Sequence, residues 1–517
     1  MEFVVILRLD NQCILKMKKL AVITLIITGA FSASFSASAQ YKTKNASENT
    51  QNTQVQHILE QADSAETPVI ITLEQALKIA LSENVSVKVA DMEIERTGFA
   101  KKGTYAALFP QIDASGAYQR TIKKQVMYMD FDMSSLGGMM GGGSTDGEGT
   151  EIPDGVQLPE TEGSSDGGGL EVGRWNTWSA GVSAAMPLVN AQLWKSITLS
   201  GLDVELAVEK ARSSRLETVT QVKNAYFATL LAKEAFNVYK DVYENAVSNY
   251  EEAKKKFDVE KVSEMELLRA KTTVANAIPN VYNAESSVIL ALWQLKAVLG
   301  VDLDMNLDIA GQLSDYAEHM FYDIHQHDSV SLDRNSTMKQ LAIQSEMLAE
   351  TIKLQKYANI PSLAVAFNFS MNAMTNDFNF SEYRWTPYSY VGLSLNIPIF
   401  AGGKRYQQIR QARNQYQQVQ LQTENTERQL KIAIRQSLTT METNMKSYYA
   451  AQDAVASAQK GYSIAEKAYQ VGRSTLIELN DAQLALTQAQ LAESQAIYNF
   501  VVAKAQLEQT LGQDFIE

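Results

Sequence analysis

Two long segments of the chain, 191–257 and 404–470, keep a helical pattern of apolar positions that only isolated glycines interrupt. In the first segment apolar side chains recur at steps of three and four residues, which is the heptad spacing of a coiled coil. They are Phe236, Tyr239, Tyr243, Ala246, Tyr250, Ala253 and Phe257. At 1.5 Å per residue each segment predicts a helix of roughly 100 Å. A compact domain of this size cannot contain such a helix.

A shorter helical stretch follows each long one and offers a matching apolar seam. The first return helix presents Leu267, Ala270, Val274, Ala277, Val281, Ala284 and Val288. The second long helix presents Ala451, Val455, Ala458, Tyr462, Ala465 and Tyr469, and its return helix presents Ala482, Ala485, Ala489, Ala492 and Ala496. These seams predict two antiparallel coiled-coil hairpins. The shorter helices must stack end to end in pairs to line the long ones, which gives two continuous and two composite rods.

Four other stretches alternate apolar and polar residues with the period of two that indicates a strand with one apolar and one wet face. They lie at about 111–122, 174–187, 362–372 and 388–398. In a soluble protein such strands form a face of an ordinary sandwich. In an exported protein they also suit a membrane barrel with lipid outside and water inside, so the pattern alone leaves both interpretations open.

The two halves of the chain repeat each other. Val259 and Val471 occupy matching motifs 212 residues apart, and the strand motifs that begin at Phe109 and Ile360 match at an offset of 251. The offsets differ because the first half contains a Gly-rich, acidic loop at about 134–173. We expect a polar linker at 40–68, a first repeat at 69–300, an inter-repeat segment at 301–335 and a second repeat at 336–517.

Residues 1–39 have the pattern of a secretory signal peptide, with an alternative start at Met17. Two lysines, an apolar run and the small-x-small sequence 37–39 follow Met17. The one cysteine, Cys13, falls in this leader, so the exported chain is expected to have no disulfide and no thiolate metal site.

The charge of the chain excludes one class of partner. The formal net charge is −13, and residues 1–39 hold four basic and two acidic side chains, so removal of the leader makes the chain more acidic. This balance argues against nucleic acid as a partner. No later segment approaches the roughly 18 consecutive apolar residues of a membrane helix.

The end of each hairpin carries a similar short turn, at Val259–Ser263 and at Val471–Thr475. Gly472 suits a helix end because glycine tolerates a positive φ, whereas Glu260 stands at the matching place of the first turn. Just past the second turn, Glu478 and Asp481 are three residues apart and share one helix face. Such a pair is most often a solvated surface.

The duplication, the motif "VGRSTLIELNDA" and the stretches "TLEQALKIALSEN" and "NIPIFAGGKRYQQIRQA" resemble the TolC family of outer-membrane efflux proteins. The resemblance covers nearly the whole chain after the leader. It implies a mainly α fold with a membrane β-barrel part: a homotrimer whose four strands per chain build a twelve-stranded outer-membrane barrel on a long periplasmic α-barrel. Physical chemistry agrees that such a sheet must close, because open sheet edges are not tolerated in lipid, and three copies leave a lumen.

The function that the resemblance implies is a passive exit duct, with no catalysis and no cofactor. A periplasmic adaptor would join the duct to an inner-membrane pump, in a tripartite efflux or type I secretion system. The main alternative is a soluble periplasmic or surface coiled-coil scaffold or adhesin, in which the strands form an ordinary β domain.

The resemblance also implies roles for particular residues. Adaptor docking falls on the two turns: Val259, Glu260, Lys261, Val262 and Ser263, and Val471, Gly472, Arg473, Ser474 and Thr475. Glu478 and Asp481 match a lumen-facing acidic pair, and Glu266, Tyr469 and Arg473 match a network that holds the entrance closed. The family's gate arginine falls on Ser474, one residue after Arg473.

Two possible metal sites are weaker candidates. His325 and His327 lie between the repeats beside two aspartates, but an incidental polar loop is the preferred interpretation. Methionines cluster in and beside the Gly-rich loop, and thioethers suit Cu(I) or Ag(I). We interpret them as incidental residues of an extracellular loop and expect no resident metal.

Overall fold

The computed structural model describes residues 68–127, 170–320, 331–379 and 382–513. The chain divides into two compact units. Unit 1 comprises Met1–Met92, Glu209–Lys339 and Asn425–Glu517, and unit 2 comprises Glu93–Val208 and Gln340–Glu424. The leader, most of the linker, most of the Gly-rich loop, His325 and His327 lie outside the described residues.

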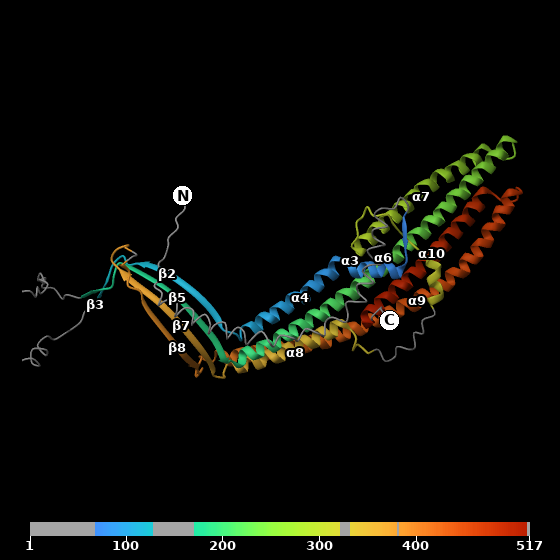
Figure 1. Ribbon diagram of the computed structural model, residues 1–517. Helices are drawn as coiled ribbons and strands as arrows, with labels where there is room; N and C mark the ends of the chain where they lie inside the picture. Colours follow the sequence, from blue (N-terminus) through green and yellow to red (C-terminus); the bar gives the residue numbers. More distant parts are fainter. Residues whose placement is uncertain (1–67, 128–169, 321–330, 380–381, 514–517) are drawn as a thin grey trace, which may run out of the picture. The chain divides into compact units, whose positions relative to one another are not determined.

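The long helices and their return helices occur where the heptad pattern predicts them. Helix α6 spans Ala191–Asp258 and α9 spans Lys404–Gln470, while the return helices are α7 (Glu264–Leu299) and α10 (Leu476–Leu511) (Figure 1). Residues 259–263 and 471–475 form the turns between them. None of the helices in the described part of the chain is both long enough and apolar enough to cross a bilayer.

The seam of the first hairpin agrees with the prediction. Ala246, Ala253, Ala270, Ala277 and Ala284, spaced by seven residues on α6 and α7, are between 0% and 7% exposed. Alanine at these positions lets the helices approach closely, and the repeated burial every seven residues is that of an antiparallel coiled coil.

The seam of the second return helix agrees with the predicted one only in part: Ala496 is 4% exposed and Ala482 packs, partly buried, beside Leu479. Leu479 and Leu486 are buried on α10, whereas Ala485 and Ala492 are exposed. Alanines occur on several faces of this helix, so spacing alone does not select one. The leucines bury more apolar area, about 0.8 kcal/mol for each CH₂, and they therefore decide which face turns inward.

Two equivalent joints within unit 1 stack the shorter helices end to end. Helix α4 (Val85–Ala106) begins after Asn84, whose Nδ2 donates to the Val298 carbonyl at 2.7 Å near the end of α7. Helix α8 (Ser336–Tyr357) begins after Asn335, whose Nδ2 donates to the Thr510 carbonyl at 2.6 Å near the end of α10. The offsets between the two joints are those of the sequence repeat, so the duplication is a structural one.

A glycine closes each joint because nothing larger fits. Gly300 and Gly512 have φ of 78° and 67° and cap α7 and α10. A Cβ on Gly300 would lie 2.7 Å from the Glu83 carbonyl oxygen, and one on Gly512 would collide with the Arg334 carbonyl oxygen. The two composite rods therefore depend on glycine for the backbone conformation and for the close approach.

The core of unit 1 is built around short elements that precede and follow the first hairpin. Strand β1 (Val69–Ile71) pairs in parallel with β6 (Leu307–Ile309), and the 3₁₀ helix η1 (Leu313–Met320) packs on α10. Helix α3 (Leu73–Glu83) begins with a capping box formed by Thr72 and Gln75. The buried Tyr226 hydroxyl donates to the Ala310 carbonyl at 2.6 Å and ties α6 to this layer.

Unit 2 contains one antiparallel four-stranded sheet in the order β2-β5-β7-β8. Its strands are β2 (Gln111–Arg120), β5 (Asn176–Val189), β7 (Ser362–Thr375) and β8 (Thr386–Asn396). A two-stranded ribbon of β3 (Gln125–Met127) and β4 (Leu170–Val172) follows β2. In the described residues β2 and β8 each have a neighbour on one side only, so the sheet has two open edges.

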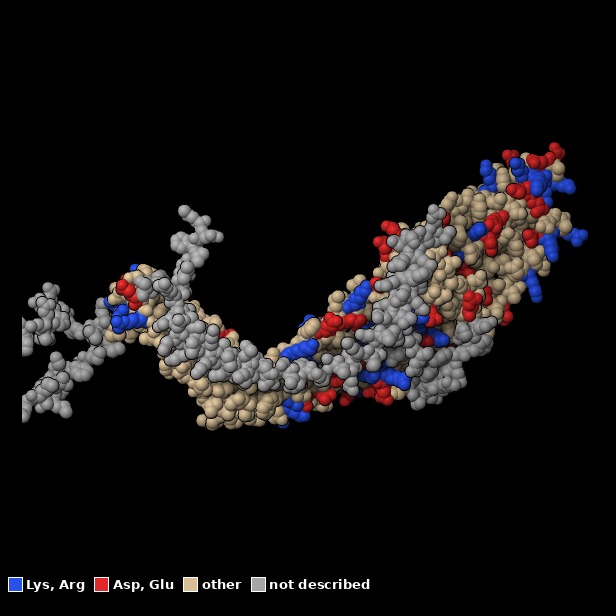
Figure 2. Space-filling model, viewed as in Figure 1, with Lys and Arg blue, Asp and Glu red and all other residues tan. Residues whose placement is uncertain are grey.

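The apolar face of this sheet is uncovered. One row across all four strands consists of Ile112, Ala184, Phe367 and Val391, which are direct partners in the register. Ile112 and Val391 are 70% and 71% exposed. Figure 2 shows much of the visible sheet surface without charged side chains. A contiguous exposed apolar surface of this kind indicates a lipid or protein partner.

Candidate functional site: the ends of the helical hairpins

The turn between α6 and α7 is a Schellman motif, although a glutamate stands at its left-handed position. The Lys261 amide donates to the Lys256 carbonyl at 2.9 Å, and the Glu260 amide donates to the Phe257 carbonyl at 2.8 Å. Glu260 has a φ of 59° and is the one positive-φ residue other than glycine in the described part of the chain. A left-handed conformation costs a residue with a side chain about 1 kcal/mol.

The turn between α9 and α10 has the same geometry. The Arg473 amide donates to the Ala468 carbonyl at 2.8 Å, the Gly472 amide donates to the Tyr469 carbonyl at 3.1 Å, and Gly472 has a φ of 76°. Each bond matches its counterpart in the first turn at the repeat offset. The replacement of glycine by Glu260 therefore leaves the shape of the first turn unchanged.

The first turns of α7 and α10 use their N3 glutamates differently. The Thr475 hydroxyl accepts from the Glu478 amide at 3.2 Å, and Glu478 Oε2 accepts from the Thr475 amide at 3.0 Å and from the Ser474 hydroxyl at 2.5 Å. The Ser474 bond, followed by the Thr475 amide, lowers the pKa of Glu478. At the first turn, Ser263 accepts from the Glu266 amide at 3.3 Å, but the structure there has no capping box.

Tyr469 lies near the end of α9 and is 2% exposed. It belongs to an apolar cluster with Ala253, Ala270 and Leu476, which joins both hairpins close to their ends. Burial raises the pKa of the Tyr469 hydroxyl, and the negative charge of the neighbouring Glu266 raises it further. Within the described residues this hydroxyl lacks a hydrogen bond of good geometry, so Glu266 acts on it first through its charge, with a smaller contribution from its carboxylate as a nearby acceptor.

Lys256 links the two hairpins and was not a candidate from the sequence. Its Nζ donates to the Tyr469 carbonyl at 2.7 Å, lies 4.2 Å from the centre of the Tyr469 ring, and forms an ion pair with Glu252 at 2.9 Å. The side chain is 19% exposed. A cation near a helix C-terminus is favourable. The signal that could have identified Lys256 in the sequence is a lysine about one turn before the end of the first hairpin, at a position where the other repeat has no lysine.

The remaining candidates lie on the surface of the hairpin ends. Arg473, Glu478 and Asp481 are exposed. Within the described residues the guanidinium of Arg473 has no hydrogen bond or ion pair, and Lys256 is the basic side chain that contacts Tyr469 in the same chain. Val259 and Val471, at the helix ends, are 61% and 69% exposed. Both turns are therefore accessible within one chain.

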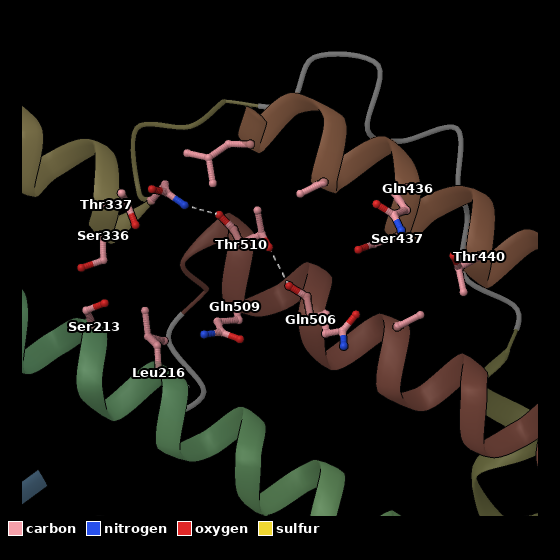
Figure 3. A pocket seen from close by; sticks show the side chains of 14 residues that line it. Ser213, Leu216, Ser336, Thr337, Gln436, Ser437, Thr440, Gln506, Gln509 and Thr510 are labelled. Atoms are coloured by element: carbon pink, nitrogen blue, oxygen red, sulfur yellow. Dashed lines mark hydrogen bonds between the residues drawn. The ribbon is translucent and has the colours of Figure 1, made fainter. Parts of the chain in front are cut away.

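Unit 1 also contains a pocket, which lies beside the joint between α8 and α10. It is an open pocket of about 420 Å³ whose lining side chains come from α6, α8, α9 and α10 and the residue before α8 (Figure 3). All of them are uncharged: Ser213, Leu216, Asn335, Ser336, Thr337, Leu430, Ala433, Gln436, Ser437, Thr440, Ala503, Gln506, Gln509 and Thr510. The pocket contains no acid, base or nucleophile pair, and we assign no chemistry to it. The described residues also contain no group of three or more metal-ligating side chains.

Two helical hairpins with equivalent ends, together with an antiparallel sheet whose apolar face is exposed, define a channel-type outer-membrane protein. Comparison with known proteins gives the family. Residues 76–301 and 329–513 match the family described as "Outer membrane efflux protein". This match covers more than half of the chain, which therefore belongs to that family of efflux channels and is located in the outer membrane.

Individual relatives are distant. The outer membrane protein TolC of Salmonella enteritidis is 21% identical over 293 residues, which are 54% of this chain and 58% of that protein. The outer membrane channel CmeC of Campylobacter jejuni superposes with a TM-score of 0.62 at 17% identity, over 87% of this chain and 91% of that chain. The outer membrane protein VceC of Vibrio cholerae gives 0.61 at 14% identity, over 86% and 96%. The predicted TolC-like fold is confirmed.

Proposed function

We propose that three copies of this chain form a passive exit duct that crosses the outer membrane and extends into the periplasm. The observation that carries the proposal is the four-stranded sheet with two open edges and an exposed apolar face. Each unpaired backbone group in hydrocarbon costs several kcal/mol, so neighbouring copies must complete the sheet. Three copies give twelve strands, enough to leave a lumen.

The hairpin ends are proposed to dock a periplasmic adaptor that connects the duct to an inner-membrane pump. The two turns are accessible and have the same Schellman geometry, with Glu260 and Gly472 at equivalent positions. A trimer would present six such turns. Because the two turns have the same backbone shape, an adaptor could dock at both. Their side chains differ, so an adaptor could still distinguish one turn from the other.

The hairpin ends are also proposed to form the narrow periplasmic entrance. Glu478 and Asp481 lie on one exposed face of α10, so three chains would place six carboxylates around the lumen. A glutamate is ionised near neutral pH, and the lowered pKa of Glu478 extends its ionisation to more acidic conditions. Tyr469 and Glu266, held with Lys256 between the hairpins, would restrain the entrance, and Arg473 remains available to a neighbouring chain.

Three measurements test the duct as a whole. The full chain should fractionate with outer membranes, migrate as a trimer in mild detergent, and form pores in planar bilayers. Deletion of its gene should increase sensitivity to exported compounds. A monomer that is soluble without detergent and forms no pore would instead support the coiled-coil scaffold.

Docking is tested by crosslinking from the turns. Gly472→Cys and Glu260→Cys, each carrying a short photoreactive label, should capture the same periplasmic protein. Gln459→Cys is the matched control, since this exposed residue lies on α9 well before the turn. Capture from Gln459→Cys as efficient as from the turns would contradict docking at the hairpin ends.

A further inference from the structure

The end of the sheet at which β2 and β7 finish and β5 begins is held by a compact cluster of polar and aromatic side chains. Asn176 is 1% exposed; its Oδ1 accepts from the Tyr118 hydroxyl at 2.9 Å, and its Nδ2 donates to the Asp377 carbonyl at 3.1 Å. The Tyr118 ring lies 4.3 Å from the Trp178 ring. These contacts join β2, β5 and the segment after β7, so the side chains around them project from a defined backbone.

Five basic residues lie in the segments that meet at this end of the sheet, and we name them the basic collar: Arg120, Lys123, Lys124, Arg174 and Arg384. They come from the end of β2, the two connections to the β3–β4 ribbon and the residues before β8. Figure 2 shows Lys and Arg side chains gathered at this end of the sheet. Lys124 Nζ lies 4.8 Å from the Trp175 ring centre, and Arg120 lies 5.8 Å from that of Phe378.

The basic collar is opposite in sign to the chain that carries it. The whole chain has a net charge of −13, and β5, β7 and β8 contain no charged residue. In the described part of the segment between β7 and β8, Asp377 and Glu382 are the carboxylates near the collar, and the five cations outnumber them. A net positive patch therefore borders an uncharged, apolar sheet face.

Large apolar side chains are exposed among the cations. Ile122, immediately before Lys123, is 94% exposed, and Trp175 and Trp385 are 38% and 40% exposed. Tryptophan is enriched where a membrane meets water, because its ring tolerates both environments. Water can solvate the cations, but it gives an exposed isoleucine no favourable contact. A lipid surface offers anionic headgroups to the cations and acyl chains to the apolar side chains.

We propose that the basic collar binds the phosphate-bearing headgroup of an outer-membrane lipid. The inference rests on the proposed function, because it needs the apolar sheet face to lie in the membrane. Arg120, Arg174 and Arg384 can each donate two hydrogen bonds to one phosphate, and Lys123 and Lys124 supply compact charge. Ile122 and the tryptophans then contact the acyl chains at the headgroup boundary.

The alternative occupant of the collar belongs to the chain itself. Residues 128–169 contain nine Asp or Glu and no Lys or Arg, so their charge also complements the collar. The position of the collar favours the lipid, since it borders the uncharged, exposed apolar face of the sheet, and a sheet face that lies in the membrane brings lipid headgroups to its end. The two occupants make opposite predictions when the loop is removed.

The test measures lipid retained by the full chain purified from outer membranes, using native mass spectrometry and a titration with diphosphoryl lipid A in detergent. The charge-reduced variant carries Lys123→Gln, Lys124→Gln and Arg174→Gln and keeps the other two cations of the collar. Each cation near an anionic lipid surface contributes about fivefold in affinity, so we expect roughly a 100-fold loss. The matched control removes three exposed lysines near the hairpin ends: Lys254→Gln, Lys255→Gln and Lys271→Gln.

Four outcomes would overturn the collar as a lipid site. These are equal loss in the control, equal affinity for dephosphorylated lipid A, full competition by inorganic phosphate alone, and lipid binding that appears only after residues 134–169 are deleted. Pore formation is measured on the same samples. A chain that forms pores but retains no phosphorylated lipid refutes the collar alone, whereas a chain that forms no pore refutes the proposed duct.

Discussion

Lys256 offers a direct test of how the two hairpins are held together. Its ammonium contacts the Tyr469 carbonyl and ring in one direction and Glu252 in the other. The change Lys256→Met keeps the length and apolar stem of the side chain and removes only the charge. Glu252, which is 30% exposed in the ion pair, remains partly hydrated after the change.

The size of the effect follows from the contacts that are lost. A hydrogen bond to a charged group contributes about 1.5–3 kcal/mol, and a cation–π contact at a partly exposed site adds about 0.5–1 kcal/mol. Loss of the ion pair with Glu252 changes little, since partly exposed pairs contribute about 0–1 kcal/mol. We therefore expect the paired arrangement of the hairpins to lose about 2 kcal/mol, or roughly 30-fold in the equilibrium between paired and separated ends.

The distance between the hairpin ends can be measured without background labelling in a chain that carries Cys13→Ser, because Cys13 is the one cysteine in the sequence. Val259→Cys and Val471→Cys occupy equivalent exposed sites and can carry spin labels. Labelled chains are diluted with unlabelled ones, so that electron–electron distances within one chain dominate. Lys256→Met should broaden the distribution toward longer distances and increase the conductance of pores in planar bilayers.

Two controls decide whether the contact with Lys256 is responsible. Lys255→Met removes the neighbouring exposed lysine and should leave both readings unchanged. Tyr469→Phe keeps the carbonyl and the ring, and the hydroxyl that it removes lacks a hydrogen bond of good geometry in the described structure, so it should also leave the hairpins paired. If Tyr469→Phe separates the ends as strongly as Lys256→Met, the restraint runs through the tyrosine hydroxyl and our reasoning is wrong.

Four further changes test the local energetics. Glu260→Gly removes a side chain from a left-handed position and should stabilise the first turn by about 1 kcal/mol, seen as slower hydrogen exchange there; unchanged exchange would contradict the strain. Gly512→Ala adds a backbone collision to an unfavourable φ and should cost about 2–4 kcal/mol in thermal unfolding, whereas Gly472→Ala, with open space around it, should cost only about 1 kcal/mol. Burial raises the pKa of Glu493, and the charge of Glu234 adds to it. The folded state therefore holds this proton more tightly, and stability falls as pH rises from the usual carboxyl pKa through the raised one. Glu493→Gln should increase the melting temperature more at pH 7 than at pH 4, and an equal gain at both would exclude this cause.

The helices, strands and turns were predictable because each has a local cause. Uninterrupted helical pattern gave α6 and α9, and alternation of period two gave the four strands. The Gly472 turn follows from the need for a positive φ, and the repeat offset then located the Glu260 turn. The buried face of α10 was not predictable from alanine spacing, because alanine is small enough for several faces and the burial of Leu479 and Leu486 decides among them.

Contacts between the repeats could not be predicted from the sequence. Lys256 and Tyr469 are 213 residues apart, and the contact exists only because the cluster around Tyr469 packs the two hairpins together. The register of that cluster depends on α10, whose inward face was itself ambiguous. Residue-level roles carried over from a family resemblance name Tyr469 and Glu266, but they contain no information about a lysine on the other hairpin.

The difference between the two turns has a simple origin in the repeat. The Ser474 hydroxyl and the Thr475 amide both donate to Glu478, so that carboxylate is hydrogen-bonded at the N-terminus of its own helix, α10. The residue that matches Ser474 in the first repeat is Val262, which has no hydroxyl. Glu266, the counterpart of Glu478, lacks this local donor and its charge acts on Tyr469 instead.

Two other differences between the repeats also make the two hairpin ends unequal. Lys256 matches Ala468, and Tyr469 matches Phe257. The first repeat therefore supplies the ammonium of this contact, whereas the second repeat has no cation at the equivalent position. Two identical copies of the second hairpin would lack this ammonium, and two identical copies of the first hairpin would place one on both ends. Divergence at these three pairs of positions therefore turns a symmetric pair of hairpins into an asymmetric one, while the Schellman backbone of both turns stays the same. The restraint within the chain and the shape offered to a partner can thus change independently of each other.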